Sequence, residues 1–116
     1  MSTTTPIMQL LQGYLKVTSD RQQMIASNIA NVDTPGYQTK DINFQSALRN
    51  ATSDGTGAHL SPAVQEVSGL PARPDGNNVN IDRESMMLSQ TQLQYQMGVQ
   101  LVKSQLHTLY TAIKEE

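Results

Sequence analysis

Two long stretches of the chain carry apolar residues three or four positions apart, which is the spacing of an amphipathic helix. The first covers residues 6–32, where Pro6 suits the first helical position and Thr5 suits the cap before it. The second covers residues 82–114, and we expect Asp82 to cap it. The pattern therefore predicts a mainly α protein with one long helix near each end.

The second stretch also has a seven-residue period, which is typical of a coiled coil. One apolar row recurs at every seventh position: Ile81, Leu88, Tyr95, Val102 and Leu109. A companion row lies four residues after the last three of these positions: Val99, Leu106 and Ile113. We call these eight residues the heptad seam. Gly98 is a residue of low helix propensity within this stretch, and its missing side chain would permit another helix to approach closely.

Residues 33–81 separate the two helices and carry most of the helix-breaking residues. Proline disfavours helix at the residue before it, so Pro35 ends the first helix. Pro35 and Gly36 fit the two central positions of a type II turn, in which glycine supplies the positive φ. Alternation of apolar and polar residues then predicts an extended segment over 37–44, followed by a short helical turn over 45–51.

The rest of the middle zone reads as connector. Gly, Pro, Ser and Asp residues punctuate residues 52–74, for which we expect a mobile loop. The dipeptide Asp75-Gly76 is typical of turns, and we expect a small hairpin or extended arm around it. The middle zone thus predicts loops with at most a small β arm.

The chain has too few apolar residues for a large core, yet they lie on more faces of the two helices than a single helix pair could cover. The 116 residues make one domain, 1–116, with 37% hydrophobic and 4% aromatic residues. Both helices carry apolar residues on more than one face, and a two-helix pair covers about one face of each. Either the uncovered residues form exposed patches that bind partners, or the two ends are poorly ordered until partners arrive, and both outcomes indicate an assembly protein. A compact monomer that uses the middle as a third element is the alternative, and the many helix breakers there disfavour it.

Candidate chemistry is sparse. The chain has no cysteine, and its two histidines, His59 and His107, lack metal-ligand spacing. No phosphate-binding glycine loop follows a strand. We therefore expect no enzyme activity, no catalytic or metal residues and no cofactor. The net charge of −2 and the absence of a basic run disfavour nucleic acid, and no apolar run is long enough to span a bilayer.

Four segments resemble a known family. Residues 27–31, Ser-Asn-Ile-Ala-Asn, and residues 33–37, Asp-Thr-Pro-Gly-Tyr, resemble the N-terminal signature of the flagellar rod, hook and hook-associated axial proteins. Residues 41–48, Asp-Ile-Asn-Phe-Gln-Ser-Ala-Leu, together with residues 75–84 and the short length, narrow the resemblance to proximal-rod proteins of the basal body.

The resemblance implies a structural subunit of the flagellar basal-body rod that self-assembles through its terminal helices into a torque-transmitting tube. It implies as partners further copies of the chain, other rod proteins, the basal-body ring protein, the rod-base adaptor and the flagellar type III export apparatus, with a rod-cap muramidase or the export gate during assembly. It also implies export to the periplasm-spanning rod without a cleaved signal, which agrees with an N-terminus that lacks a basic and apolar leader.

Twelve residues are predicted to make subunit contacts. They are Asn28, Ile29, Asn31, Pro35, Gly36, Tyr37, Leu88, Tyr95, Val99, Val102, Leu106 and Leu109. The two asparagines suit either a C-terminal cap or a hydrogen bond across a helix interface. The alternative function is a small helical adaptor or export chaperone that binds one client through the heptad seam. A chaperone would be a well-folded dimer alone, whereas a rod subunit would be mostly monomeric with protease-sensitive ends.

Overall fold

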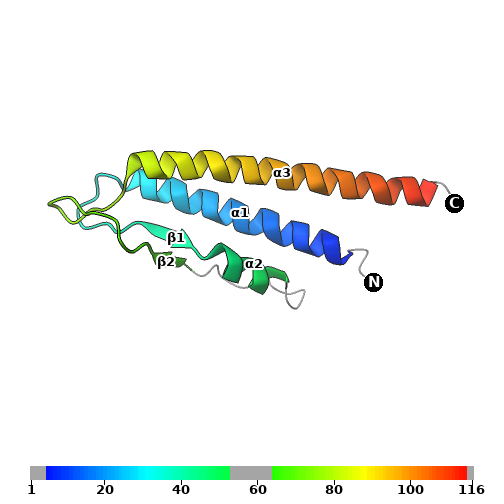
Figure 1. The fold of residues 1–116 in the computed structure, drawn as a ribbon, viewed down its shortest axis with the longest axis horizontal. Helices are drawn as coiled ribbons and strands as arrows, with labels where there is room; N and C mark the ends of the chain where they lie inside the picture. Colours follow the sequence, from blue (N-terminus) through cyan, green and yellow to red (C-terminus); the bar gives the residue numbers. More distant parts are fainter. Residues whose placement is uncertain (1–4, 53–63, 115–116) are drawn as a thin grey trace.

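The protein is an elongated helical molecule. The computed structural model describes residues 5–52 and 64–114 and measures 67 × 26 × 19 Å. In chain order the elements are α1 Pro6–Ala30, β1 Lys40–Ile42, α2 Phe44–Thr52, β2 Val64–Glu66 and α3 Ile81–Lys114. The predicted mainly α class, with two long terminal helices, a loop-rich middle and a small β element, is confirmed (Figure 1).

Helix α1 starts as the sequence predicts. The Thr5 side-chain oxygen accepts a hydrogen bond from the Met8 N–H at 3.2 Å, and Pro6 occupies the first helical position. The helix ends at Ala30, slightly before the predicted end at residue 32, with Asn31 as its C-cap. The Asn31 side chain donates to the Ser27 carbonyl at 2.8 Å, and the same carbonyl accepts the Asn31 backbone N–H at 3.1 Å, so Asn31 is bonded twice to the last turn.

The prediction that Asp82 caps α3 is wrong. The helix begins one residue earlier, at Ile81, and the Asn80 Oδ1 accepts the Arg83 N–H at 3.1 Å. Asn80 is therefore the N-cap, because its side chain satisfies an N–H group of the first turn that has no partner within the helix. Asp82 and Glu84 lie in that first turn, where the helix dipole favours negative charge.

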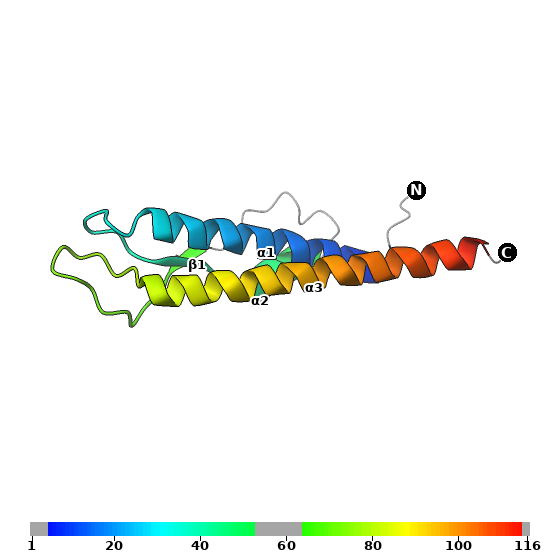
Figure 2. The ribbon, with the colours of Figure 1, turned by 90° about the horizontal axis from the view of Figure 1, so that it is seen from above.

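The two long helices run antiparallel, side by side (Figures 1 and 2). Contacts at two points fix their register: Asn28 meets Glu84 near one end, and Leu15 meets Gly98 in the middle. Pro6 then lies level with about residue 106, so α3 projects about eight residues, roughly 12 Å, beyond the start of α1. One end of the helix pair is flush, and the other end is a single unaccompanied helix.

Gly98 is the point of close approach between the helices. A Cβ atom on this residue would lie 2.7 Å from the Leu15 Cδ2 and 3.0 Å from the Tyr14 Cδ1. The expectation that Gly98 admits another helix is confirmed, and that helix is α1 of the same chain. Tyr14 is partly buried there, and the loss of solvent around its hydroxyl raises the pKa of that group above its ordinary value.

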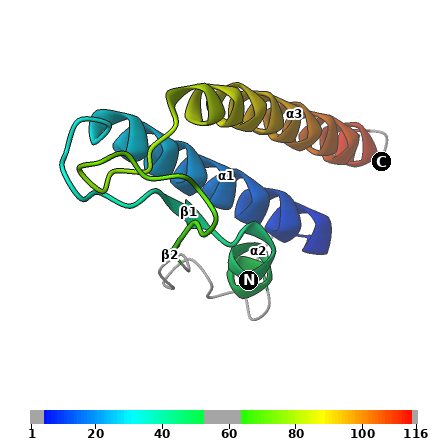
Figure 3. The same ribbon diagram turned by 60° about the vertical axis from the view of Figure 1, so that its left-hand side comes forward.

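The middle of the chain packs on the side of α1 away from α3 (Figure 3). Val17, Ile42 and Ala47 form a small core there, and Met24 and Phe44 pack against it. Arg21 of α1 makes a two-pronged ion pair with Asp41 of β1, with both nitrogen–oxygen distances at 3.1 Å. Helix α1 is thus the centre of the molecule, and α3 has one face on it.

The middle zone is more ordered than predicted. Strand β2 pairs antiparallel with β1, so the expected mobile loop over 52–74 is wrong for residues 64–66, while residues 53–63 lie outside the described residues. The extended segment ends before Phe44, which starts α2, because Asn43 Oδ1 accepts the Ser46 N–H at 3.1 Å and caps that helix. The expected short helix is confirmed and is longer than one turn.

The expected turn at Asp75-Gly76 is present. The Gly76 N–H donates to the Arg73 carbonyl at 2.8 Å, and the Arg73 N–H donates to the Asn77 carbonyl at 2.8 Å. Gly76 has φ 87, which explains why glycine stands there. These bonds form a narrow, hairpin-like turn, although the strand pair of the molecule forms elsewhere.

Candidate functional site

A network of buried amides closes the flush end of the helix pair. We call Asn28, Tyr37, Asn77, Asn78 and Glu84 the polar junction. Asn28 of α1 is its centre, and the Nδ2 group donates to the Lys40 carbonyl and to the Glu84 Oε1, both at 2.7 Å. Its Oδ1 accepts from the Tyr37 hydroxyl at 2.8 Å and from the Lys40 N–H at 3.1 Å. The amide therefore makes all four hydrogen bonds available to it.

Glu84 brings a charge into this end of the interface. Its side chain is fully buried, and its two oxygens accept from Asn28 and, at 2.5 Å, from the Arg83 guanidinium. A buried carboxylate is costly unless it is paired and hydrogen-bonded. Asn28 supplies one of those bonds from the opposite helix, so these two residues fix α3 against α1 at this level.

Asn77 holds the turn that follows α1. Its Nδ2 group donates to the Asn31 carbonyl at 2.9 Å and to the Thr34 carbonyl at 2.8 Å. Its Oδ1 accepts the Val79 N–H at 2.8 Å. Both carbonyls also accept backbone N–H groups of the turn, from Thr34 and Tyr37, so the buried Asn77 side chain adds a second bond to each.

The turn itself has the predicted geometry. Gly36 has φ 77, and the Tyr37 N–H donates to the Thr34 carbonyl at 3.2 Å, as in a type II turn. The Gly36 N–H donates to the Asp75 carbonyl at 2.9 Å, and a Cβ atom on Gly76 would lie 3.4 Å from the Gly36 Cα. Two glycine turns therefore lie back to back at the tip.

Asn78 joins the same segments one residue further on. Its Oδ1 accepts the Thr39 N–H at 2.6 Å, and its Nδ2 donates to the Gln38 side-chain oxygen at 3.0 Å. Arg73 adds bonds from its guanidinium to the carbonyls of Val79 and Val32. Hydrogen bonds therefore join residues 75–84 to residues 28–39, the part of the chain that holds nearly all of the first two resemblance-bearing segments.

The structure divides the predicted contact residues into two groups. Asn28 and Tyr37 meet inside the polar junction, and Asn31, Pro35 and Gly36 form the adjoining turn, of which Pro35 and Gly36 are exposed. Ile29 is half-buried beside them. Both structural roles expected of the asparagines are present: Asn31 is the C-cap, and Asn28 bonds across the helix interface.

The second group lies along α3 and is not the row that α1 buries. The most buried residues of α3 are Glu84, Met87, Thr91 and Gly98. The heptad seam lies beside this row: Leu88, Val99, Val102 and Leu109 are half-buried, whereas Ile81, Tyr95, Leu106 and Ile113 are exposed. One edge of the seam therefore remains uncovered by the chain's own residues.

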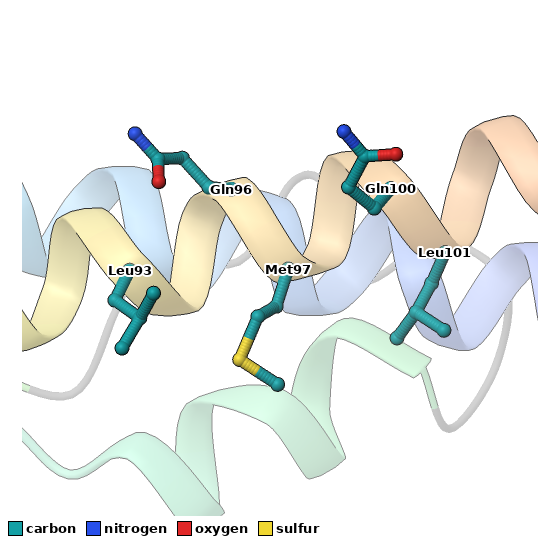
Figure 4. A pocket seen from close by; sticks show the side chains of 5 residues that line it. All are labelled: Leu93, Gln96, Met97, Gln100 and Leu101. Atoms are coloured by element: carbon teal, nitrogen blue, oxygen red, sulfur yellow. The ribbon is translucent and has the colours of Figure 1, made fainter.

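A second apolar row lies on the other side of the buried row. We call Met86, Leu93, Met97 and Leu101 the methionine face; all four are exposed. Leu93, Met97 and Leu101, with Gln96 and Gln100, line a shallow groove of about 540 Å³. Figure 4 shows the three apolar side chains extending to one side of α3 and the two glutamines to the other.

The sequence did not predict tertiary contacts for three members of the junction: Asn77, Asn78 and Glu84. An Asn-Asn pair after a glycine turn is equally typical of an ordinary loop. A carboxylate in the first turn of a helix is equally explained by the helix dipole. They form a buried network only through partners distant in sequence: Glu84 through α1, and Asn77 and Asn78 through the segment that follows α1.

The arrangement offers hydrogen bonds and apolar surface rather than reactive groups. Within residues 5–52 and 64–114 no three histidine or acidic side chains gather where they could hold a metal ion. Among the described helices, none combines the length and the apolar character that crossing a bilayer requires.

Comparisons with known proteins agree with this picture. The family model described as "Flagella basal body rod protein" matches residues 8–38, which span most of α1 and the turn after it. A flagellar basal body rod protein FlgB of Salmonella typhimurium LT2 is 36% identical, over 89% of both chains. The FlgB proteins of Escherichia coli K12 and Bacillus subtilis 168 are 32% identical over 89% of both chains and 28% identical over 97% of both chains.

The polar junction, the exposed rows of α3 and these relatives define a non-enzymatic structural protein of the bacterial flagellum. The chain belongs to the flagellar basal body rod protein family. Membership places it in the basal body and implies association with other rod and basal-body components.

Replacement of the turn should separate folding from motility. In the double variant Pro35→Ala with Gly36→Ala, the alanine at position 36 must adopt the positive φ of Gly36, which is 77°. An alanine in that conformation costs about 1 kcal/mol. We expect normal expression and helix content but no swimming in soft agar, because the tip no longer has one fixed direction. Gly69→Ala is the matched control, since Gly69 also has positive φ, 85, but lies outside the junction. Normal swimming of the double variant would contradict an orienting role of the turn.

Proposed function

We propose that the chain is a subunit of the proximal rod that self-assembles through its terminal helices into a torque-transmitting axial tube. The observation that carries this proposal is the uncovered part of the heptad seam. Leu106 is 52% exposed and Ile113 is 72% exposed, and Ile113 lies on the part of α3 that projects beyond α1. Exposed apolar rows on a long helix are typical of surfaces that pack against another helix.

Rigidity supports the mechanical part of the proposal. The antiparallel pair is fixed at Gly98 by close contact and at Asn28–Glu84 by buried hydrogen bonds. Such a unit bends little between those points, so a load applied at its tip would reach the projecting end of α3. Heterologous contacts between copies that do not close into a ring would extend the unit along an axis.

Partners and route follow from the family. We propose other rod proteins, the ring protein and the rod-base adaptor as neighbours, and export through the flagellar type III apparatus without a cleaved signal. The predicted contact residues of α3 and the exposed turn residues Pro35 and Gly36 remain our proposed subunit contacts, whereas Asn28 would act by holding the junction in shape. Family membership favours this function over the export-chaperone alternative.

Charges placed in the seam test the proposal. For Val102→Asp with Leu106→Asp we expect at least about tenfold less of the chain in purified basal bodies, because burying one unpaired charge costs more than the 1.4 kcal/mol that a factor of ten requires. Immunoblots of basal bodies and whole cells give the ratio.

Two further variants make the result specific. Leu106→Asp with Ile113→Asp changes exposed residues alone and should have the same effect without loss of helix content. Ser89→Asp with His107→Asp adds charge at exposed polar positions of α3 and should incorporate normally. Unchanged incorporation of both seam variants would remove the seam from the contact surface.

A further inference from the structure

The middle of α3 carries no charge on any face. From Ser85 to Val102 the chain has no Asp, Glu, Lys, Arg or His, and its polar residues are serine, threonine and glutamine. Helices that keep a face in water normally place charged residues on it. Neutral amides cost less to bury than charges, so this composition suits a helix that is covered on further sides.

The methionine face holds most of the exposed large apolar side chains of that uncharged segment. Leu93 is 58% exposed, Met97 55% and Leu101 52%, and they stand four residues apart, in one row along the helix. Rows of side chains four residues apart are the surfaces by which helices commonly pack against one another. Methionine in its middle can adapt its shape to the occupant, and Gln96 and Gln100 border it with hydrogen-bonding groups (Figure 4).

Helix α1 has two uncharged segments, residues 6–15 and 22–30, and only the first exposes large apolar side chains that would fit there. Residues 6–15 of α1 carry no charge, and the first charged residue of the chain is Lys16. Ile7 is 42% exposed and Leu10 43%, one turn apart, and the glutamines Gln9 and Gln12 beside them are exposed. At 1.5 Å per residue this segment is about 15 Å long, against about 12 Å for the row from Leu93 to Leu101.

We propose that the methionine face of one copy receives the first half of α1 of a second copy, with Ile7 and Leu10 against Met97. This inference rests on the proposed self-assembly and names the partner at one of its surfaces. No charge is desolvated in the contact, and the amides on both helices can bond to each other. One copy's groove and another copy's helix end are different surfaces, so the contact is heterologous and leaves a free site of each kind.

The contact is too small to hold a dimer alone. Two short helix segments bury less than the roughly 1,200 Å² of a stable interface, so it would form when other contacts hold the copies together. The test therefore uses assembled basal bodies, and the cysteine-free chain allows single thiols to be placed without background.

The experiment uses two copies with different tags, co-expressed in the same cells. One carries Met97→Cys and the other Leu10→Cys, and a short bismaleimide links them only where the two side chains face each other. We expect about tenfold more doubly tagged dimer than for the control pair Met97→Cys and Gln23→Cys, because a fixed neighbour has a high effective concentration. Gln23 is exposed on the same helix but lies in residues 22–30, which expose no large apolar side chain.

The outcomes are distinct from failure of the proposed function. Entry of both tagged chains into basal bodies with no dimer above the control overturns the inference and leaves self-assembly through the seam intact. A link from Met97→Cys to a different rod protein, identified by mass spectrometry, also overturns it. Should these variants stay out of basal bodies, Leu93→Cys with Ile7→Cys replaces the pair and Leu93→Cys with Gln23→Cys replaces the control, and the same two outcomes decide.

Discussion

Asn28→Ala should lower the free energy of unfolding by about 3 kcal/mol, because it leaves the buried Glu84 carboxylate with a missing partner. The same change removes the acceptor of the Tyr37 hydroxyl and both bonds to the Lys40 backbone. A chain of this length has about 5–15 kcal/mol of stability in total, so this one amide accounts for a large share of it. Urea unfolding followed by circular dichroism measures the loss.

Matched variants separate this effect from loss of a side chain in general. Gln23→Ala removes an exposed amide from the same helix and should change the free energy of unfolding by less than about 0.5 kcal/mol. Asn31→Ala removes a bond in the exposed last turn and should cost about 1 kcal/mol.

A double-mutant cycle identifies Glu84 as the reason for the cost. Asn28→Ala with Glu84→Ala leaves no buried carboxylate to satisfy, so its loss should be smaller than the sum of the single losses by at least about 1 kcal/mol. Strictly additive losses would show that the two side chains do not act as a pair, and the register assigned to α1 and α3 at that point would then be in doubt.

The helices could be predicted from the sequence because their ends carry strong local signals. Thr5 and Pro6 begin α1, and Pro35 bounds it, through backbone chemistry that needs no tertiary partner. Asn80 and Asp82 both suit an N-cap, and only the position of the first helical hydrogen bond distinguishes them. The errors at helix ends are therefore one or two residues, as expected of local rules.

The buried face of α3 could not be predicted from periodicity. The apolar heptad pointed to Leu88, Tyr95 and Val102, yet α1 buries a row that includes Glu84, Thr91 and Gly98. Hydrophobicity does not favour that row. Its burial depends on features of the other helix, namely an amide that satisfies Glu84 and an aromatic ring that fills the space at Gly98.

The strand pair and the polar junction depend on contacts distant in sequence. All three residues of β2 are exposed, so the strand has no apolar alternation to reveal it, and it forms because β1 offers backbone groups. Asn77 bonds to carbonyls of the turn more than forty residues earlier. The turn was predictable because Pro35-Gly36 is local, while the side chain that holds it was not.

Gly98→Leu should separate the two long helices and reduce the free energy of unfolding by about 2–3 kcal/mol. The new Cβ atom alone would lie 2.7 Å from Leu15 and 3.0–3.1 Å from the Tyr14 ring. The end of the Leu15 side chain can turn away, but the Tyr14 ring is held edge-on against Phe44 with centroids 5.7 Å apart. The remaining leucine atoms then have no space unless α3 moves off α1.

A series at this position distinguishes steric pressure from helix propensity. Gly98→Ala gains about 1 kcal/mol of propensity and loses a similar amount to the close contact, so its free energy of unfolding should change little. Adding Leu15→Ala to Gly98→Leu should restore part of the loss, since it vacates the nearest atom. Gln96→Leu, at an exposed position two residues away, should leave stability within about 0.5 kcal/mol of the parent.

Assembly should respond to the same series more strongly than folding does. A shift of α3 by even a fraction of a helical turn moves both the heptad seam and the methionine face relative to the tip of the molecule. We therefore expect Gly98→Leu to be absent from basal bodies even where the purified chain is still folded, and Gly98→Ala to incorporate. Stable incorporation of Gly98→Leu at parental levels would mean that the spacing between α1 and α3 does not set the geometry of the subunit contacts.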